Sequence, residues 1–144
     1  MNPSITSEDA ALAHADIAKA LRRGDLPIVT ASQPLAPGDQ CHFASPVRFG
    51  RRRSDQYGHL LLTTGWVKFR GTVDLSLTWS EVAAVRRTAR DIVVWLQDSR
   101  RLLRFSCHSE SEALRGVLIA EHLARSASVH QTDSSTASEH HAAL

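Results

Sequence analysis

The central part of the chain alternates apolar and polar residues with a period of two, which is the pattern of half-buried β-strands. Because turn-forming residues separate the alternating stretches, we expect seven short strands, around residues 41–49, 60–63, 66–70, 75–79, 81–85, 92–96 and 102–106. Strands of this length and spacing predict an antiparallel barrel or sandwich rather than a fold built from βαβ units.

Three of the predicted strands carry further signals. The first strand is expected to break or bulge around Ser45-Pro46, because proline cannot donate a hydrogen bond to a sheet ladder. Leu75, Leu77 and Trp79 should share one face of their strand. The run Ile92–Leu96 is almost wholly apolar and β-branched, so we expect it to be buried on both faces.

Helical periodicity flanks the strands on both sides. Residues 6–23 place apolar residues on one narrow, alanine-rich stripe, so this helix would bury little and either packs weakly on the body or binds a partner. The capping box Ser109–Glu112 opens a second helix that would run to about Ser126 and close the open end of a barrel. Ile119 and Leu123 lie off its main apolar stripe, which predicts that more than one side of this helix is covered.

The chain therefore divides into four segments. Residues 1–24 form the N-terminal helix, residues 25–39 form a proline-containing linker, and residues 40–126 form the β-domain with its helix. Residues 127–144 are rich in Ser, Thr, His and Ala and are expected to be disordered. The predicted fold class is mainly β (α+β): a seven-stranded antiparallel barrel or sandwich capped by a C-terminal helix, with an additional N-terminal helix.

Composition restricts the class of protein. The 144 residues are 42% apolar and 22% charged, which is typical of one globular domain that folds without a metal or a disulfide. No apolar run approaches the roughly 20 residues that span a bilayer. Residues 1–4 show neither the basic nor the apolar region of a secretory signal, so we expect a cytoplasmic protein that can also bind peripherally at a membrane.

The net charge of +2 hides an uneven distribution of charge. Residues 41–108 carry 12 basic and 5 acidic side chains, whereas the segments before and after them are net acidic. A basic body attracts phosphate, anionic lipid or an acidic partner. A plainer explanation also stands, because 15 of the 17 basic residues are Arg, which fits coding bias, and surface charge often only solvates a face.

A stretch in the middle of the predicted sheet resembles a known family. Gly58–Gly71, with the sequence GHLLLTTGWVKFRG, looks like the central hairpin of GRAM-type domains, and Leu75–Val82, with the sequence LSLTWSEV, resembles the segment that follows it. Seven antiparallel strands followed by one amphipathic helix is also the order of elements in pleckstrin-homology-like (PH-like) domains. Over about residues 38–126 the chain thus resembles the GRAM and PH-like family, as a small bacterial-type protein.

This resemblance implies a binding module without naming a lipid. Lipid-binding members of the family tend to carry a basic residue late in strand one and Arg-x-Arg in strand two. Arg48 and Arg51–Arg53 can supply the first part, but residues 59–62, His-Leu-Leu-Leu, contain no Arg-x-Arg. We therefore expect a non-enzymatic adaptor that recognises either a protein partner or an anionic membrane surface.

The strongest candidate site is a basic cluster at one end of the sheet. Arg51–Arg53 lie in the predicted loop after the first strand, and Lys68 and Arg70 are expected to point outward from the third. Since loops one–two and three–four share an end of an up-and-down sheet, Arg70 would join the loop arginines. The predicted anion or partner site comprises Arg48, Arg51, Arg52, Arg53, Lys68 and Arg70. Arginine binds phosphate oxygens bidentately; the alternative is a solvated loop that deters edge aggregation.

Other chemistries have less support in the sequence. Arginines around the last predicted hairpin, with Trp66 and Trp95, keep nucleic-acid binding as an alternative function, although no recognised binding motif is present. Cys41-His42 and Cys107-His108 lack zinc-site spacing, because neighbouring residues in a strand point to opposite faces, and two buried thiols are expected instead. Since no catalytic motif is present, we expect no enzyme activity, no cofactor and no metal, with a small enzyme as the least favoured alternative.

Overall fold

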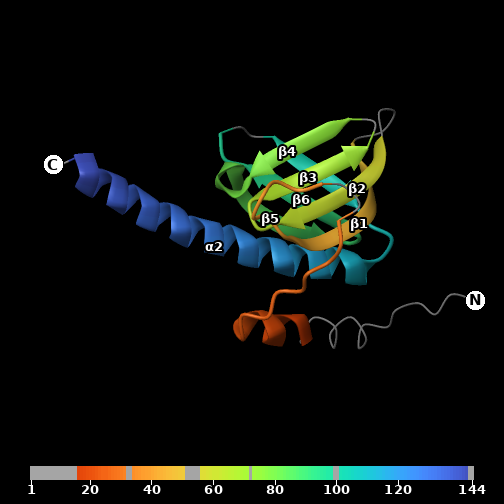
Figure 1. The fold of residues 1–144 in the computed structure, drawn as a ribbon. Helices are drawn as coiled ribbons and strands as arrows, with labels where there is room; N and C mark the ends of the chain where they lie inside the picture. Colours follow the sequence, from red (N-terminus) through yellow and green to blue (C-terminus); the bar gives the residue numbers. More distant parts are fainter. Residues whose placement is uncertain (1–15, 32–33, 51–55, 72, 99–100, 143–144) are drawn as a thin grey trace, which may run out of the picture.

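The computed structural model describes residues 16–31, 34–50, 56–71, 73–98 and 101–142, with side chains up to residue 127 (Figure 1). Its strands are β1 (Cys41–Phe49), β2 (Gln56–Thr63), β3 (Trp66–Gly71), β4 (Asp74–Thr78), β5 (Val82–Thr88), β6 (Asp91–Leu96) and β7 (Leu102–Ser106). A 3-10 helix, η2 (Trp79–Glu81), separates β4 from β5, and helix α2 (Glu110–Ala142) follows β7. Residues 16–22 form a short helix before the sheet.

All seven strands belong to one antiparallel sheet in the order β4-β3-β2-β1-β7-β6-β5. Strand β1 pairs with β2 along its length but with β7 only at Arg48 and Phe49, and this short pairing joins the two layers of a sandwich. The mainly β class with a C-terminal helix is thus confirmed. A closed barrel is not, because β4 and β5 end the sheet on either side and do not pair with each other.

The register of the strands explains the core. Antiparallel pairing places Phe43, Leu62 and Val67 level with one another on the inner face of β1, β2 and β3. Each is at most 3% exposed. The core is built from such alternating positions in both layers: Phe43, Val47, Leu60, Leu62, Val67, Phe69, Val85, Ile92, Val94 and Phe105.

Helix α2 begins at the predicted capping box and covers one side of the sandwich. The Ser109 hydroxyl accepts the N–H of Glu112 at 3.1 Å, which satisfies a free amide of the first turn. The side chains that face the sheet are buried: Ala113, Val117, Ile119, Ala120 and Leu123. Gly116 permits the closest approach, because a Cβ at this position would lie 2.5 Å from Cδ1 of Ile92.

Coverage of α2 from two sides is confirmed. Ile119 and Leu123, which lie off the predicted stripe, are 0% and 2% exposed and belong to the core. Leu114 and Leu118 line clefts that α2 shares with the segment 16–27. In Figure 1 the short helix lies on the far side of α2 from the sheet, so α2 is the middle layer of three.

Helix α2 is longer than the sequence predicts. Instead of ending near Ser126, it continues to Ala142 and projects beyond the sheet (Figure 1), while the expected disorder of residues 127–144 stays a prediction. No glycine or proline lies between Arg125 and Ala142 to end the helix. Ala127, the last residue of α2 whose side chain is described, packs against the core.

The linker before β1 is fastened to the sheet by hydrogen bonds. The N–H of Val29 donates to the carbonyl of Cys41 at 2.9 Å. Further along, the Asp39 carboxylate accepts the N–H of Gly65, in the turn between β2 and β3, at 3.0 Å. Figure 1 shows this segment running from the short helix across α2 and over the sheet to β1.

The burial of Lys68 contradicts its predicted exposure to solvent. It does lie on the outer face of β3, level with Leu61 of β2. However, Lys68 is only 8% and Leu61 only 1% exposed. The ammonium of Lys68 lies 5.6 Å from the centroid of the Trp66 ring, which offers it a cation–π contact. Coverage of an outer face is a tertiary effect that strand periodicity does not contain.

Strand β1 is irregular at a different place from the predicted one. Its pairing with β2 runs through Ser45-Pro46, whereas the register shifts within residues 41–43. Proline is tolerated here because β1 has no strand on its β7 side at this point. The shift turns His42 inward, where its Nδ1–H donates to the Pro27 carbonyl and its Nε2 bonds the Thr64 hydroxyl, each at 2.8 Å.

Two tryptophans also depart from the predicted pattern. The run Ile92–Val94 is at most 4% exposed as expected, but Trp95 is 41% exposed, so the outer face of β6 is covered only in part. Trp79 lies in η2 rather than in a strand. It is buried nonetheless, and its Nε1–H donates to the carbonyl of Thr63 at 2.9 Å.

Candidate anion-binding groove

A cavity of about 510 Å³ opens on the outer surface where β1 and β2 meet the β5–β6 turn and the end of β7. We call it the basic groove and define it by its lining residues: Pro46, Val47, Arg48, Tyr57, Gly58, His59, Arg90, Ser106, Cys107 and His108. These residues provide two guanidinium groups, two imidazoles and a phenol hydroxyl. None of the described lining residues carries a carboxylate.

The pairing of β1 with β2 sets one wall of the groove. Arg48 is level with Tyr57, and Pro46 is level with His59, so all four lie on the outer face. Gly58 lies between the two β2 residues, and a Cβ there would come 2.3 Å from the carbonyl oxygen of Arg70 on β3. Only glycine therefore allows β2 and β3 to approach each other this closely beside the groove.

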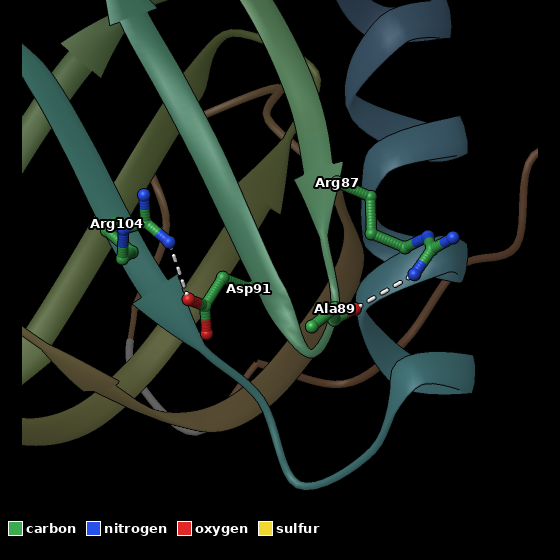
Figure 2. Close-up of polar contacts among 4 residues, drawn as sticks. All are labelled: Arg87, Ala89, Asp91 and Arg104. Atoms are coloured by element: carbon green, nitrogen blue, oxygen red, sulfur yellow. Dashed lines mark hydrogen bonds and ion pairs between the residues drawn. The ribbon is translucent and has the colours of Figure 1, made fainter.

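The β5–β6 turn brings Arg90 to the other wall. Ala89 has a φ of 52°, in the left-handed region, and its carbonyl accepts a hydrogen bond from Nη1 of Arg87 at 3.0 Å (Figure 2). The next strand is held by an ion pair of 2.9 Å between Asp91 and Arg104 (Figure 2).

A backbone bond then joins this turn to the end of β7. The N–H of Cys107 donates to the carbonyl of Arg90 at 2.8 Å. Since β7 also pairs with β1 at Arg48 and Ser106, the same strand fixes Arg90 relative to Arg48. The two arginines are thus positioned by the backbone and not by a flexible loop.

The thiol of Cys107, which lines the groove, favours its protonated form. Burial raises the pKa of Cys107 to about 12, with Glu112 and then Asp91 adding to the effect. Burial likewise raises the pKa of Cys41. Both cysteines are free and buried, as predicted, and a neutral thiol is a weaker nucleophile than a thiolate. The groups of the groove that suit an anion are its guanidinium groups and its hydrogen-bond donors.

The structure describes three of the six residues of the predicted site. Arg48 lines the groove, whereas Arg51–Arg53 fall outside the described residues, in the connection between β1 and β2. Lys68 is buried beside Trp66. Arg70 lies on the same outer face but forms an ion pair of 3.7 Å with Asp74, which partly neutralises it.

Sequence reasoning missed most of the groove. Tyr57, His59 and His108 were scattered among loop and strand positions, and Arg90 belonged to a different cluster of arginines. Pairing β1 with β2 residue by residue would have placed the first two beside Arg48. No signal in the sequence places Arg90 there, because its position depends on the β5–β6 turn and on β7.

Exposed apolar side chains lie at the end of the sheet next to the groove. Tyr57 is 73% exposed at the start of β2, and Val73 is 50% exposed after β3. The pairing of Gly58 with Gly71 places these two positions at the same end of the sheet. An exposed aromatic ring beside arginines is a combination found where proteins meet a membrane interface.

Two further searches concern metals and membranes. Within the described part of the chain, no three His, Cys, Asp or Glu side chains gather in an arrangement that could hold a metal ion. Among the helices that the structure describes, none has the length and apolar character to cross a bilayer.

Comparison with solved structures places the fold. Residues of this chain superpose on Linker-DH/PH domains of p115-RhoGEF with a TM-score of 0.55 and 13% identity, covering 81% of this chain and 41% of that one. The fold is PH-like. The chain spans less than half of that larger protein, so the likeness concerns the fold and no activity.

Two smaller structures share this PH-like fold. The C-terminal domain of an unknown protein from Leishmania infantum matches with a TM-score of 0.51 and 14% identity, over 60% of this chain and 86% of that one. Inner Membrane Complex Sub-compartment Protein 3 from Toxoplasma gondii matches with a TM-score of 0.50 and 13% identity, over 58% and 75%. The sequence matches no protein-family model and no curated protein, so the GRAM resemblance stays a prediction.

Proposed function

We propose that the protein is a non-enzymatic PH-like binding module that attaches to an anionic membrane surface through the basic groove. The observation that carries this proposal is the pair of guanidinium groups that line the groove, Arg48 and Arg90, beside the imidazoles of His59 and His108, without a carboxylate among the described lining residues. Arg51–Arg53 follow β1 in the sequence and would add positive charge next to it.

A membrane fits the surroundings of the groove better than a soluble anion does. Each arginine near an anionic bilayer contributes about 1 kcal/mol of attraction. A guanidinium group can also donate two parallel hydrogen bonds to the oxygens of one phosphate. Tyr57 and Val73 supply exposed apolar contacts at the same end of the sheet, which a soluble anion would not need. The protein would then be cytoplasmic and peripheral, with a protein partner as the second candidate because basic surfaces also bind acidic proteins.

Vesicle co-sedimentation of the full chain tests the proposal. We expect binding to vesicles of phosphatidylcholine with phosphatidylserine, weaker binding at high salt, and none to phosphatidylcholine alone. The double variant R48E/R90E should lose at least tenfold in affinity, since two cations become two anions. Arg125→Glu, at an exposed position of α2, is the control for a reversal of charge outside the groove and should have little effect on vesicle binding.

The outcomes separate the candidate functions. Equal binding of R48E/R90E and wild type would show that the groove is not the membrane site. No vesicle binding, with salt-resistant retention of a soluble protein, would replace the membrane by a protein partner. Binding to any DNA sequence with a steep salt dependence would favour the nucleic-acid alternative.

A further inference from the structure

A second cavity, of about 580 Å³, opens between the two layers of the sandwich. We call it the interlayer slot and define it by its lining residues: Phe49, Gly50, Leu75, Leu77, Leu96, Arg101, Leu102, Leu103 and Arg104. It shares no residue with the basic groove. Its size lies within the range of small-molecule sites in proteins, roughly 300 to 1,000 Å³.

The open edges of the sheet create this slot. Because β4 does not pair with β5, the leucines of β4 face the β6–β7 hairpin without a ladder between them. Leu75 and Leu77 are level with the core residues Phe69 and Val67, and together with Leu96 they pack against the core but remain only partly buried. The slot thus reaches from solvent to the hydrophobic core.

An aromatic cluster forms the boundary between the slot and the core. Phe49 lines the slot, and its ring lies 5.1 Å from that of Phe69 and 5.0 Å from that of Phe105. The latter two rings are fully buried. A ligand in the slot would therefore meet Phe49 and the leucines, which offer dispersion contacts and no hydrogen bonds.

The charge at the slot selects among apolar ligands. Arg101 and Arg104 line it, and none of its described lining residues is acidic. Arg104 is held in place by its ion pair of 2.9 Å with Asp91. Arg101 is exposed at the start of the β7 side of the hairpin. An apolar wall with a cationic side complements a molecule that has an alkyl chain and an anionic head.

We propose that the interlayer slot binds the alkyl chain of a single-chain anionic amphiphile, with its carboxylate or phosphate beside Arg101. Free fatty acid and a lysophospholipid drawn from a membrane share this chemistry. The slot is a separate site from the basic groove, so the proposal stands whether or not the groove binds membranes.

Calorimetric titration of the full chain with laurate, below its micelle concentration, tests the slot. Binding should strengthen roughly tenfold for every two methylenes added from octanoate to laurate, because each buried methylene contributes a constant free energy. Dodecanol and dodecyltrimethylammonium should bind at least tenfold more weakly than laurate, since they lack the anionic head. Affinity that is independent of chain length, or equal for the cationic amphiphile, would overturn the proposal.

Variants locate the site. Leu77→Trp fills the slot with a larger apolar side chain and should abolish laurate binding, while Leu118→Trp in the cleft beside α2 serves as the matched control. Arg101→Glu should weaken laurate by at least tenfold and dodecanol much less. If Leu77→Trp does not fold, as judged by circular dichroism, Leu75→Gln tests the slot without filling it, because a polar amide in its apolar wall should weaken laurate binding. If a folded variant of the slot, such as Leu77→Trp, binds laurate as tightly as the wild type does, the proposal is wrong.

The same variants distinguish the two sites and the two sources of ligand. R48E/R90E should lose vesicle binding and keep laurate, whereas Leu77→Trp should do the reverse. Vesicles containing lysophosphatidylglycerol should bind Leu77→Trp less well than wild type if the slot extracts a chain from a membrane. If that difference is absent while laurate still binds, the slot takes free fatty acid. Loss of laurate binding in R48E/R90E would show that the groove holds it and would overturn the slot.

Discussion

The side of the sandwich under α2 and the side open between β4 and the β6–β7 hairpin are both built from strands that carry apolar side chains, yet they are packed differently. Under α2, Ala113 and Ile119 are fully buried, and Gly116 leaves no room for a methyl group against Ile92. On the open side, Leu75 and Leu77 stay accessible in a cavity. We therefore expect the completely packed interface under α2 to contribute more to stability than the open side does. The incompletely packed open side leaves space for a ligand.

Truncation of one apolar residue on each side should give the largest contrast. Ile119→Ala removes a fully buried side chain and should cost about 2–5 kcal/mol of unfolding free energy. Leu77→Ala removes a partly buried one, and about 1 kcal/mol is expected. Urea denaturation measures both values. Equal losses at the two positions would mean that the slot is as tightly packed as the interface under α2.

Addition of one methyl group under α2 should have a somewhat smaller effect. Gly116→Ala places a Cβ 2.5 Å from Cδ1 of Ile92 and 3.1 Å from Cζ of Phe43, so the Ile92 side chain or α2 must shift, at a cost of about 1–3 kcal/mol. Gly65→Ala is the matched control, because the nearest atom to its added Cβ, a carboxylate oxygen of Asp39, lies 3.8 Å away. Thermal unfolding compares the two, and a Gly116→Ala protein as stable as the control would contradict the close packing.

Alkaline pH should lower the unfolding free energy of the protein, by a smaller amount for each pH unit than the substitutions described above. Burial raises the pKa of Cys107 to about 12 from its ordinary value of 9.0, so the native state keeps the thiol proton where the unfolded chain has lost it. Stability is then complete below about pH 9 and falls as pH rises toward 12, by at most about 1.4 kcal/mol per unit.

The alanine variant isolates this contribution of the thiol. Cys107→Ala removes the titrating group, so its unfolding free energy should decline less steeply than that of the wild type between pH 9 and pH 11. Urea denaturation at several pH values measures the two slopes. Parallel slopes would show that the thiol is not protected from ionisation.

The sequence contains enough information for the order of the elements because periodicity is local. Alternation predicts most of β1–β7, and the Ser109–Glu112 capping box marks the start of α2 to within a residue. The errors arise where distant segments meet. The linker that reaches β1 covers an outer face and His42, and neither effect can be read from the alternation of nearby residues.

The two cavities also could not be predicted from local sequence patterns, because each depends on contacts between distant segments. The family resemblance makes Arg48 a candidate, because lipid-binding relatives carry a basic residue late in strand one, whereas Arg90 joins it only through β7 and a backbone bond to Cys107. The leucines of the slot look like any core leucines in the sequence. Their exposure depends on β4 and β5 failing to pair, which is decided by the whole sheet.

The imidazole of His42 has a consequence for how the native state opens. It is 3% exposed and ties the backbone at Pro27 to the hydroxyl of Thr64. With the backbone bond from Val29 to Cys41, it attaches the described segment 16–31 to the sheet without a strand ladder. We therefore expect this segment to open while the strand pairs stay intact, with amides that exchange with solvent before those of β2 and β3.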